Sequence, residues 1–341
     1  MEFNFFLIAE EKLIEWVASN ATVVSAKQSL TLIREGDYCK EFYILRHGNL
    51  FVTTSRRSED DVLLAKLSEG ALVGEMSFLE SRPPVATVVA EAGSEILAVN
   101  KDTLSSAIKN DSSLGRALYH LLAQKLSQQI QQQNAMVHKF SGNVVEPLRK
   151  VLTLFSDLSE SDVIWISNKG RLYRLKPEQT LIRQGDTLPE IFLILAGDAS
   201  VSVQLDDKEK IVGSSTRGEL LGEMSMVNSQ YNLTTATVRA ATGMETIGID
   251  KAALKDKIQS NTGFGMRFYR GMSRMLSQRG RDQLASMGLA YRSQAKETDG
   301  EVSSSDDSID FDMLSGITTA GTRFDWLCKQ FQNKTASNLN G

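Results

Sequence analysis

The sequence predicts an α+β protein with two β-roll (jelly-roll-like) domains, each with flanking helices, and a flexible C-terminal tail. Three observations predict this fold. A segment of about 100 residues occurs twice, which indicates an internal repeat. Each copy is rich in short runs of β-branched and aromatic residues separated by glycines, as expected for short strands joined by turns. Each copy is followed by a stretch whose apolar residues recur at helical spacing.

The repeat consists of the same sequence motifs in the same order. "LTLIREGDYCKEFYILRHGNLFV" begins at Leu30, and "QTLIRQGDTLPEIFLILAGDASV" begins at Gln179. Gly36 and Gly185, in the two turns, are 149 positions apart. The motif G-E-M-S begins at Gly74 and again at Gly222, 148 positions apart. Agreement in both identity and spacing predicts that the second half duplicates the first.

The remaining segments complete the domain organisation. The N-terminal "MEFNFFLIAEEKLIEW" lacks a basic leading segment and predicts an amphipathic helix, not a signal peptide. A long helix is expected over about 114–136 after the first roll, and another helix leads into the second. We therefore expect a first domain over 1–140 with its long helix, a second over 141–290, and a tail over 291–341. The aliphatic stripe of the first long helix could support a homodimer.

Composition limits the classes of function. With 341 residues, 41% hydrophobic and 23% charged, the chain is of ordinary globular composition. A net charge of -4 gives no overall attraction to nucleic acid. Two cysteines and three histidines form no disulfide framework and no zinc motif, so no metal site is expected, and the cysteine usage fits a cytoplasmic protein. No apolar run is long enough to predict a transmembrane segment.

The two copies resemble cyclic-nucleotide-binding domains, the module of catabolite-activator proteins, protein kinase A regulatory subunits and gated channels. The resemblance rests on the R-x-G-D turn, the F-x-I-L-x-x-G strand and the G-E-x-S segment that ends in A-T-V. It covers about 8–135 and 150–285. The resemblance implies β-rolls. It also implies a cyclic nucleotide as the ligand, and no cofactor. In that family the glutamate accepts the ribose hydroxyl, and an arginine nine residues later pairs with the phosphate.

The chain departs from this pattern at the arginine. Counting from Glu75 places Pro84 there, and the corresponding residue of the second copy is Thr234. A charge-assisted hydrogen bond of this kind contributes about 1.5–3 kcal/mol, so its loss weakens phosphate binding. The candidate ligand-binding residues are Gly74, Glu75, Met76, Ser77, Arg82 and Thr87 in the first copy, and Gly222, Glu223, Ser225, Thr234 and Thr237 in the second.

Two interpretations of these segments remain open. In one, Gly74-Glu75 and Gly222-Glu223 are structural turns, and the protein is a non-enzymatic regulator or scaffold that acts through contacts with a protein partner. In the other, it is a genuine cyclic-nucleotide receptor, with Arg82 turning toward the first site. A DNA-binding regulator is the weaker alternative, because the predicted helices are not followed by a basic helix-turn-helix. The sequence contains no motif of an enzyme that we recognise.

The tail combines an acidic run with an aromatic segment. The run "ETDGEVSSSDDSIDFD" from Glu297 has seven acids and no cation, so it cannot bury enough apolar area to fold alone. Beyond it, apolar residues return at helical spacing. We expect these residues to dock on a partner: Phe311, Phe324, Trp326, Leu327 and Phe331. Folding of the same segment onto its own domain is the alternative.

Overall fold

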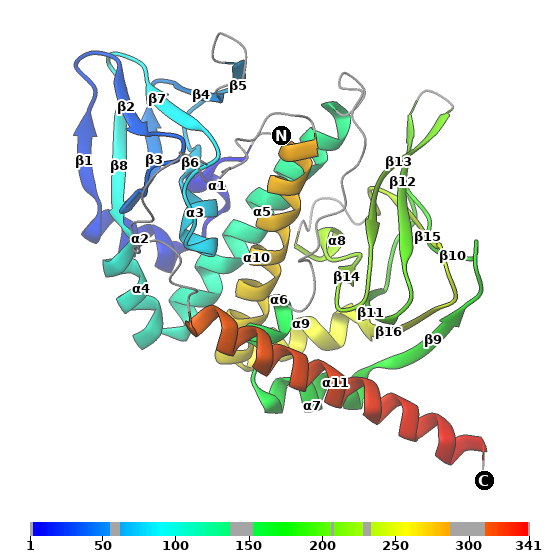
Figure 1. The fold of residues 1–341 in the computed structure, drawn as a ribbon. Helices are drawn as coiled ribbons and strands as arrows, with labels where there is room; N and C mark the ends of the chain where they lie inside the picture. Colours follow the sequence, from blue (N-terminus) through cyan, green and yellow to red (C-terminus); the bar gives the residue numbers. More distant parts are fainter. Residues whose placement is uncertain are drawn as a thin grey trace, which may run out of the picture. The chain divides into compact units, whose positions relative to one another are not determined.

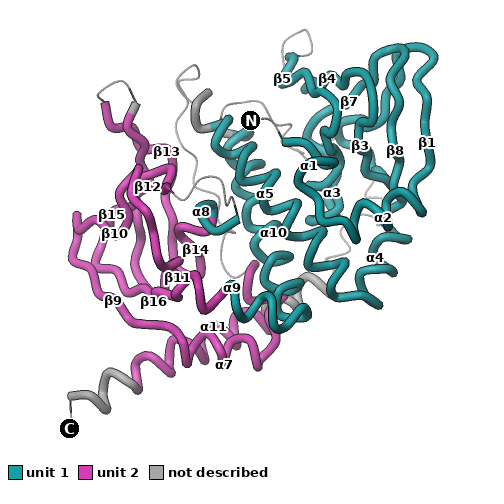
Figure 2. The backbone as a smooth tube through the Cα atoms, turned by 180° about the vertical axis from the view of Figure 1, so that it is seen from behind, with its two compact units in different colours: residues 1–147, 224–231, 255–291 teal, residues 148–223, 232–254, 292–341 magenta. Residues whose placement is uncertain are grey.

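The computed structural model describes residues 3–54, 62–136, 153–205, 208–227, 233–286 and 311–339. The chain forms two compact units, shown in different colours in Figure 2. Unit 1 comprises residues 1–147, 224–231 and 255–291, and unit 2 comprises residues 148–223, 232–254 and 292–341. Each unit contains one antiparallel β-roll with flanking helices, which confirms the predicted fold class.

The roll of unit 1 has two four-stranded sheets, at the blue and cyan end of the ribbon in Figure 1. One has the order β1 (Thr22–Ser25), β8 (Glu95–Asn100), β3 (Glu41–His47) and β6 (Leu72–Val73). The other has the order β2 (Leu30–Ile33), β7 (Thr87–Ala90), β4 (Leu50–Thr54) and β5 (Val62–Leu67). Alternate residues of these strands point inward and form one core, which includes Ile33, Leu45, Leu50, Val88 and Ile96.

The roll of unit 2 repeats this topology. Its sheets have the orders β14 (Leu220–Leu221), β11 (Glu190–Ala196), β16 (Met244–Asp250), β9 (Arg171–Leu175), and β10 (Thr180–Ile182), β15 (Thr237–Ala240), β12 (Ala199–Leu205), β13 (Lys208–Ser215). The irregularities in strand pairing also recur in the second roll. The pairing of β3 with β8 shifts register between Leu45 and His47, and that of β11 with β16 shifts between Ile194 and Ala196. The predicted duplication is therefore visible in the strand registers.

The helices of unit 1 pack around α5 (Ser112–Met136) and α10 (Thr262–Ser286), which lie side by side in both views of the chain. The others are α1 (Phe5–Ile8), α2 (Glu11–Asn20), α3 (Glu75–Glu80), α4 (Lys101–Asn110), α8 (Met224–Val227) and most of α9 (Lys251–Ser260). The apolar stripe of α5, which includes Leu118, Leu122 and Leu126, is buried. Because α10 contacts α5 within one chain, the suggested homodimer through this helix stays a prediction.

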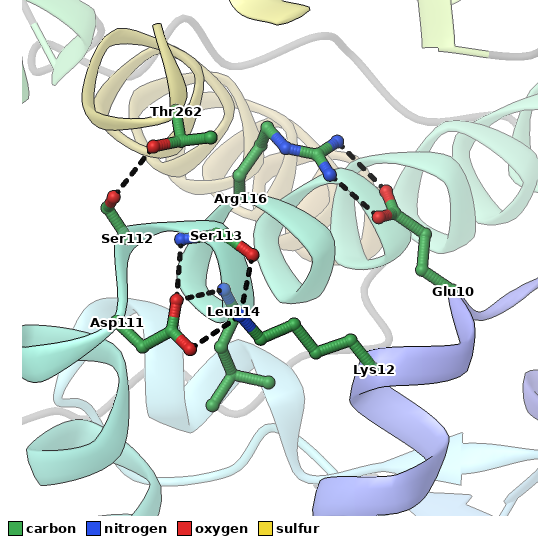
Figure 3. A network of polar contacts seen from close by, with 8 residues as sticks. All are labelled: Glu10, Lys12, Asp111, Ser112, Ser113, Leu114, Arg116 and Thr262. Carbon is green, nitrogen blue, oxygen red and sulfur yellow. Dashed lines mark hydrogen bonds and ion pairs between the residues drawn. The ribbon is translucent and has the colours of Figure 1, made fainter.

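Polar contacts fix the start of α5 to its neighbours (Figure 3). The Asp111 carboxylate accepts hydrogen bonds from the backbone N–H groups of Ser113 and Leu114, which caps the helix. Lys12 of α2 pairs with the same carboxylate at 2.6 Å. Arg116 donates two hydrogen bonds to Glu10, at 2.9 and 2.7 Å. The N-terminal helices are thus tied to α5 by paired charges as well as by apolar packing.

Unit 2 has three helices among its described residues: α6 (Thr153–Asp157), α7 (Glu160–Lys169) and α11 (Phe311–Leu339). Helix α11 packs on α6 and α7, and its residues Phe324, Leu327 and Phe331 are buried. The Phe324 ring meets the Phe155 ring edge to face, with centroids 5.0 Å apart. The aromatic segment therefore makes the contacts expected if it folds onto its own domain, and docking on a partner stays a prediction.

Several expectations fall on residues outside the described ranges. The acidic run up to residue 310 is one, and the domain limits near 140 and 290 are others. Those limits stay a prediction. The compact units nevertheless assign α10, which follows the second roll in the chain, to the same unit as the first roll. None of the described helices combines the length and apolar character that a membrane crossing requires.

Candidate functional site

The first G-E-M-S segment forms a tight connection between β6 and α3. Gly74 precedes α3 with a φ of 90°, in the left-handed region that favours glycine. A Cβ at this position would lie 3.2 Å from Ile33 Cδ1 and 3.3 Å from both Glu41 O and Phe42 Cα. The glycine is therefore required both by the backbone conformation and by the lack of space. It delivers Glu75, Met76 and Ser77 into the interior of the roll, where all three are buried.

A cavity of about 280 Å³ lies beside this segment. Its walls are mostly apolar and come from the strands of the roll and from the segment just before β7. Those wall residues include Ile33, Val52, Ala65, Leu67, Leu72, Val73, Val85, Ala86 and Val88. Its polar edge is formed by Glu75, Ser77 and one face of α5. Such a hollow, mainly apolar with a few convergent polar groups, is typical of a small-molecule site.

Glu75 at this edge is already paired. Its side chain is 5% exposed and forms an ion pair with the Nζ of Lys125 on α5, which is itself 15% exposed. The two charges neutralise each other, as buried charges must. A carboxylate has about four acceptor sites, so Glu75 can still accept hydrogen bonds from a ligand.

A second lysine, Lys101, binds Ser77. The Nζ of Lys101 donates to Ser77 Oγ at 2.5 Å and to the backbone oxygen of Cys39 at 2.7 Å. Burial lowers the pKa of Lys101 from its usual value, against the opposing attraction of nearby acidic groups. This lysine stabilises the connection into α3 and is not among the cavity-lining residues.

Hydrogen bonds confirm that Pro84 and Thr234 occupy equivalent positions. In the first roll, Gly36 N donates to Pro84 O at 3.0 Å, and Glu35 N donates to the Thr87 hydroxyl at 3.1 Å. In the second, Gly185 N donates to Thr234 O at 2.9 Å, and Gln184 N donates to the Thr237 hydroxyl at 3.1 Å. Thr87 and Thr237 thus close turns in both rolls. Neither roll carries an arginine at the position where the resemblance implies one.

Arg82 lies away from the cavity. Its side chain is 45% exposed, and its nearest charged partner is Glu80, at 4.0 Å. Arg281 of α10 contacts the end of α3 and the turn that follows it. Its Nε lies 2.8 Å from Glu80 Oε2, and one terminal nitrogen donates to Pro83 O at 3.1 Å. Ser277 of the same helix donates to the other Glu80 oxygen. Arg281 is therefore bound to protein groups.

The second G-E-M-S segment retains only part of this arrangement. Gly222 has a φ of 78°, and a Cβ there would lie 2.3 Å from Leu188 Cδ2. Glu223 is buried, and Ser225 is half-buried on the short helix α8. The Thr234 hydroxyl donates to the backbone oxygen of Arg183 at 2.5 Å, so it stabilises the turn that contains Arg183. The roles suggested for these residues in ligand binding stay predictions, as do those in the first roll.

Sequence reasoning missed the residues that α5 contributes to the first site and the Arg281 contact from α10. They come from α5 and α10, and motif spacing within the roll says nothing about them. The spacing on α5 did contain a signal. Its cavity-lining residues fall at i, i+3, i+4, i+7 and i+8, which is one face of a helix; they are Lys125, Gln128, Gln129, Gln132 and Gln133.

Comparison with known proteins agrees with the repeated roll. The family model described as cyclic nucleotide-binding domain matches residues 23–111 and again residues 172–261. The cAMP-dependent protein kinase regulatory subunit of Mycosarcoma maydis is 27% identical over 232 residues, 64% of this chain and 39% of that protein. The corresponding subunit of Blastocladiella emersonii is 25% identical over 240 residues, 68% of this chain and 52% of that protein.

Among solved structures, the regulatory domain of Toxoplasma gondii PKA with cAMP is 17% identical. The alignment covers 75% of this chain and 89% of that one, with a TM-score of 0.30. The chain spans about half or less of the length of the two curated relatives.

Proposed function

Because the chain belongs to the cyclic nucleotide-binding domain family and contains that domain twice, we propose that it is a non-enzymatic regulatory protein that acts through contacts with a protein partner. Its first roll retains a cavity but lacks recognition of a cyclic phosphate. The proposed partner is a kinase catalytic subunit, since the curated relatives are regulatory subunits of a cAMP-dependent kinase. A cytoplasmic location is part of the same proposal.

The observation that carries the proposal is the state of the charges at the first site. Pro84 stands where a phosphate partner is implied, and among the described residues the one lysine that lines the cavity already pairs with Glu75. A phosphate that entered this cavity would lose its water and gain no unpaired cation. Removing an ion from water without a partner costs several kcal/mol. Binding of a cyclic nucleotide is therefore disfavoured, while the roll and its helices remain available for contacts with protein.

The test measures two properties of the full chain. In an assay of a cAMP-dependent kinase catalytic subunit, we expect the chain to inhibit phosphorylation of a peptide substrate, and cAMP not to relieve that inhibition. Albumin at the same concentration is the control. No inhibition at any ratio of chain to kinase would exclude this partner. Inhibition that cAMP relieves would instead show that the chain responds to a cyclic nucleotide.

A second candidate function is a cyclic-nucleotide receptor, which the cavity beside Glu75 favours. Calorimetry with cAMP, cGMP and cyclic dinucleotides separates it from the first. On our proposal none binds below about 1 mM, a free energy of binding near -4 kcal/mol. Micromolar binding that is abolished by Glu75→Ala, in a variant with an unchanged circular dichroism spectrum, would establish the receptor and overturn the proposal.

A further inference from the structure

We propose that the buried face of α5 is an interaction surface whose partner is α10 of the same chain, and that the two helices pair with the two-fold symmetry of a dimer. Helix α5 follows the first roll and α10 follows the second, so the interface pairs two equivalent helices of the repeat. Both helices belong to unit 1. On this assignment the face of α5 is closed to a second copy of the chain.

The two helices correspond residue by residue. Both have 25 residues, and they begin at Ser112 and Thr262, which are 150 positions apart. A capping side chain precedes each helix, Asp111 before α5 and Asn261 before α10, and it accepts a hydrogen bond from the backbone N–H three residues later. A residue of α5 and the residue 150 positions later therefore occupy equivalent places in the two helices.

One contact joins a residue to its own equivalent. In a two-fold interface, if residue i contacts residue j, the equivalent of j contacts the equivalent of i. The Oγ of Ser112 lies 2.9 Å from the Oγ1 of Thr262, as Figure 3 shows. A contact between two equivalent residues lies beside the axis of a two-fold pair. The axis therefore passes near the first turns of α5 and α10.

Two glycines in the first turns of the helices make reciprocal contacts. A Cβ at Gly115 would lie 2.5 Å from the Sδ of Met266, and a Cβ at Gly265 would lie 3.0 Å from the Cδ of Arg116. Arg116 and Met266 are equivalent positions, so each glycine faces the side chain that follows the other glycine. Glycine is unfavourable within a helix. Its presence at both positions lets the two backbones approach closely.

The aromatic residues one turn further on repeat this reciprocity. The Tyr269 ring stacks on the His120 ring, with centroids 4.5 Å apart. The Arg270 guanidinium lies over the Tyr119 ring, 6.0 Å from its centroid. Each tyrosine thus contacts the residue that follows the other tyrosine. Reciprocal contacts that recur at one offset of 150 positions identify a two-fold pair within a single chain.

The apolar stripes of the two helices are fully buried in the single chain. Ser273 of α10 also donates to the backbone oxygen of Tyr119 at 2.8 Å, which fixes how the helices lie along each other. A second copy could reach the stripe of α5 only by displacing α10. The buried residues of α5, each followed by its equivalent in α10, are Leu118 and Phe268, Leu122 and Met272, and Leu126 and Leu276.

Each long helix also contacts the short helix that follows the G-E-M-S motif of the other repeat. Helix α10 contacts α3, where Ser277 and Arg281 bind Glu80. Helix α5 contacts α8, where the Nε2 of Gln124 donates to the backbone oxygen of Val227 at 3.0 Å. The pairing of α5 with α10 therefore supports both short helices. A second copy that displaced α10 would also remove these contacts of α3.

The experiment is thiol cross-linking of the full chain under mild oxidation, read on a non-reducing gel. In the double variant Ser112→Cys, Thr262→Cys we expect most of the protein to form a link within one chain, because hydroxyls 2.9 Å apart bring the sulfur atoms within reach. Oxidation should also raise its midpoint of thermal unfolding. Ser112→Cys alone should give no covalent dimer. The unmodified chain is the control for Cys39 and Cys328.

Three results would overturn the inference. A covalent dimer of Ser112→Cys beyond that of the unmodified chain would show that α5 pairs with α5 of a second copy. A covalent dimer of the double variant would show that the helices are exchanged between copies. The absence of any link in the double variant would contradict the contact itself. Monomeric sedimentation of the unmodified chain would support the inference without any variant. The kinase assay of the proposed function stands apart from all of these results.

Discussion

Arg281 of α10 forms an ion pair with Glu80 at the end of α3, with Nε 2.8 Å from Oε2. Both side chains are largely buried, at 13% and 3% exposed. The same arginine reaches the backbone of Pro83, next to the position of the missing phosphate partner. A residue that follows the second roll in the chain thus contacts the segment after the first G-E-M-S motif.

Replacement of Arg281 by methionine should destabilise unit 1. It keeps much of the side-chain volume but leaves the buried Glu80 carboxylate without its main cation, which typically costs about 3–5 kcal/mol. Arg82, 4.0 Å from the same oxygen, compensates only in part. Urea unfolding followed by circular dichroism measures the loss. The double variant with Glu80→Gln should lose less than Arg281→Met alone; an equal loss would show that the two residues are not coupled.

Gly74→Ala should destabilise the protein more than Gly36→Ala. Both glycines have positive φ, 90° and 82°, so alanine pays a conformational cost of roughly 1–2 kcal/mol at either position. At Gly36 an added Cβ meets nothing within 4 Å, whereas at Gly74 it meets Ile33, Glu41 and Phe42. Crowding should add about 1–3 kcal/mol at Gly74 alone. Thermal unfolding of the two variants checks this, and equal shifts would argue against the close approach.

His120 should make the stability of unit 1 depend on pH. Burial lowers the pKa of His120 to about 4, and the charge of Arg116 adds to this against an opposing effect of Glu10. The ring stacks on Tyr269, with centroids 4.5 Å apart. The unfolded chain, with a histidine pKa near 6.5, binds a proton that the folded one does not, so stability is lost as the pH falls from about 6.5 toward 4.

The total effect of His120 is of the order of 3 kcal/mol. Urea unfolding at several pH values measures it, and His120→Gln isolates it from the carboxylates that titrate in the same range. The difference in unfolding free energy between the two proteins should shrink steadily on acidification. A difference that is constant with pH would mean that His120 is protonated as easily in the folded state as in the unfolded chain.

Phe324→Ala should release α11 from unit 2. The ring is fully buried against Phe155, with the Arg217 guanidinium 4.9 Å from its centroid. Its removal should cost about 3–5 kcal/mol. Trp326→Ala is the matched control, because Trp326 is 38% exposed and should cost much less. Hydrogen exchange of 318–333 measures the opening of the helix; similar exchange in both variants would contradict the observed packing.

The roll could be predicted because each local signal agreed with the others. The T-L-I-R-x-G-D turns, the β-branched runs and the spacing between Gly36 and Gly185 all required the same strands, and the registers repeat accordingly. Local consistency of this kind is what specifies a fold. Counting from Glu75 also identified Pro84 as the residue at the arginine position, and its hydrogen bond from Gly36 N was found only in the structure.

The polar residues that α5 and α10 contribute to the site could not be predicted in the same way. The run "QQIQQQN" after Lys125 does not by itself predict a binding site, because its polarity suits an exposed helix end. Only the packing of α5 beside the roll distinguishes Gln133, which is buried, from Gln131. The role of Arg281 could not be predicted either, because its partner Glu80 lies about 200 positions earlier in the sequence and no local pattern links the two residues.

The assignment of α10 to unit 1 has a consequence for the order of synthesis. Domains generally begin to fold from the N-terminus as the chain leaves the ribosome. When residues 1–147 have emerged, Ser277 and Arg281 have not yet been made, so Glu80 has neither of its α10 partners. Unit 1 can be completed only after the strands of the second roll have been translated. A nascent chain therefore carries an incomplete unit 1 while residues 148–281 are translated, and a fragment that stops after α5 lacks part of that unit.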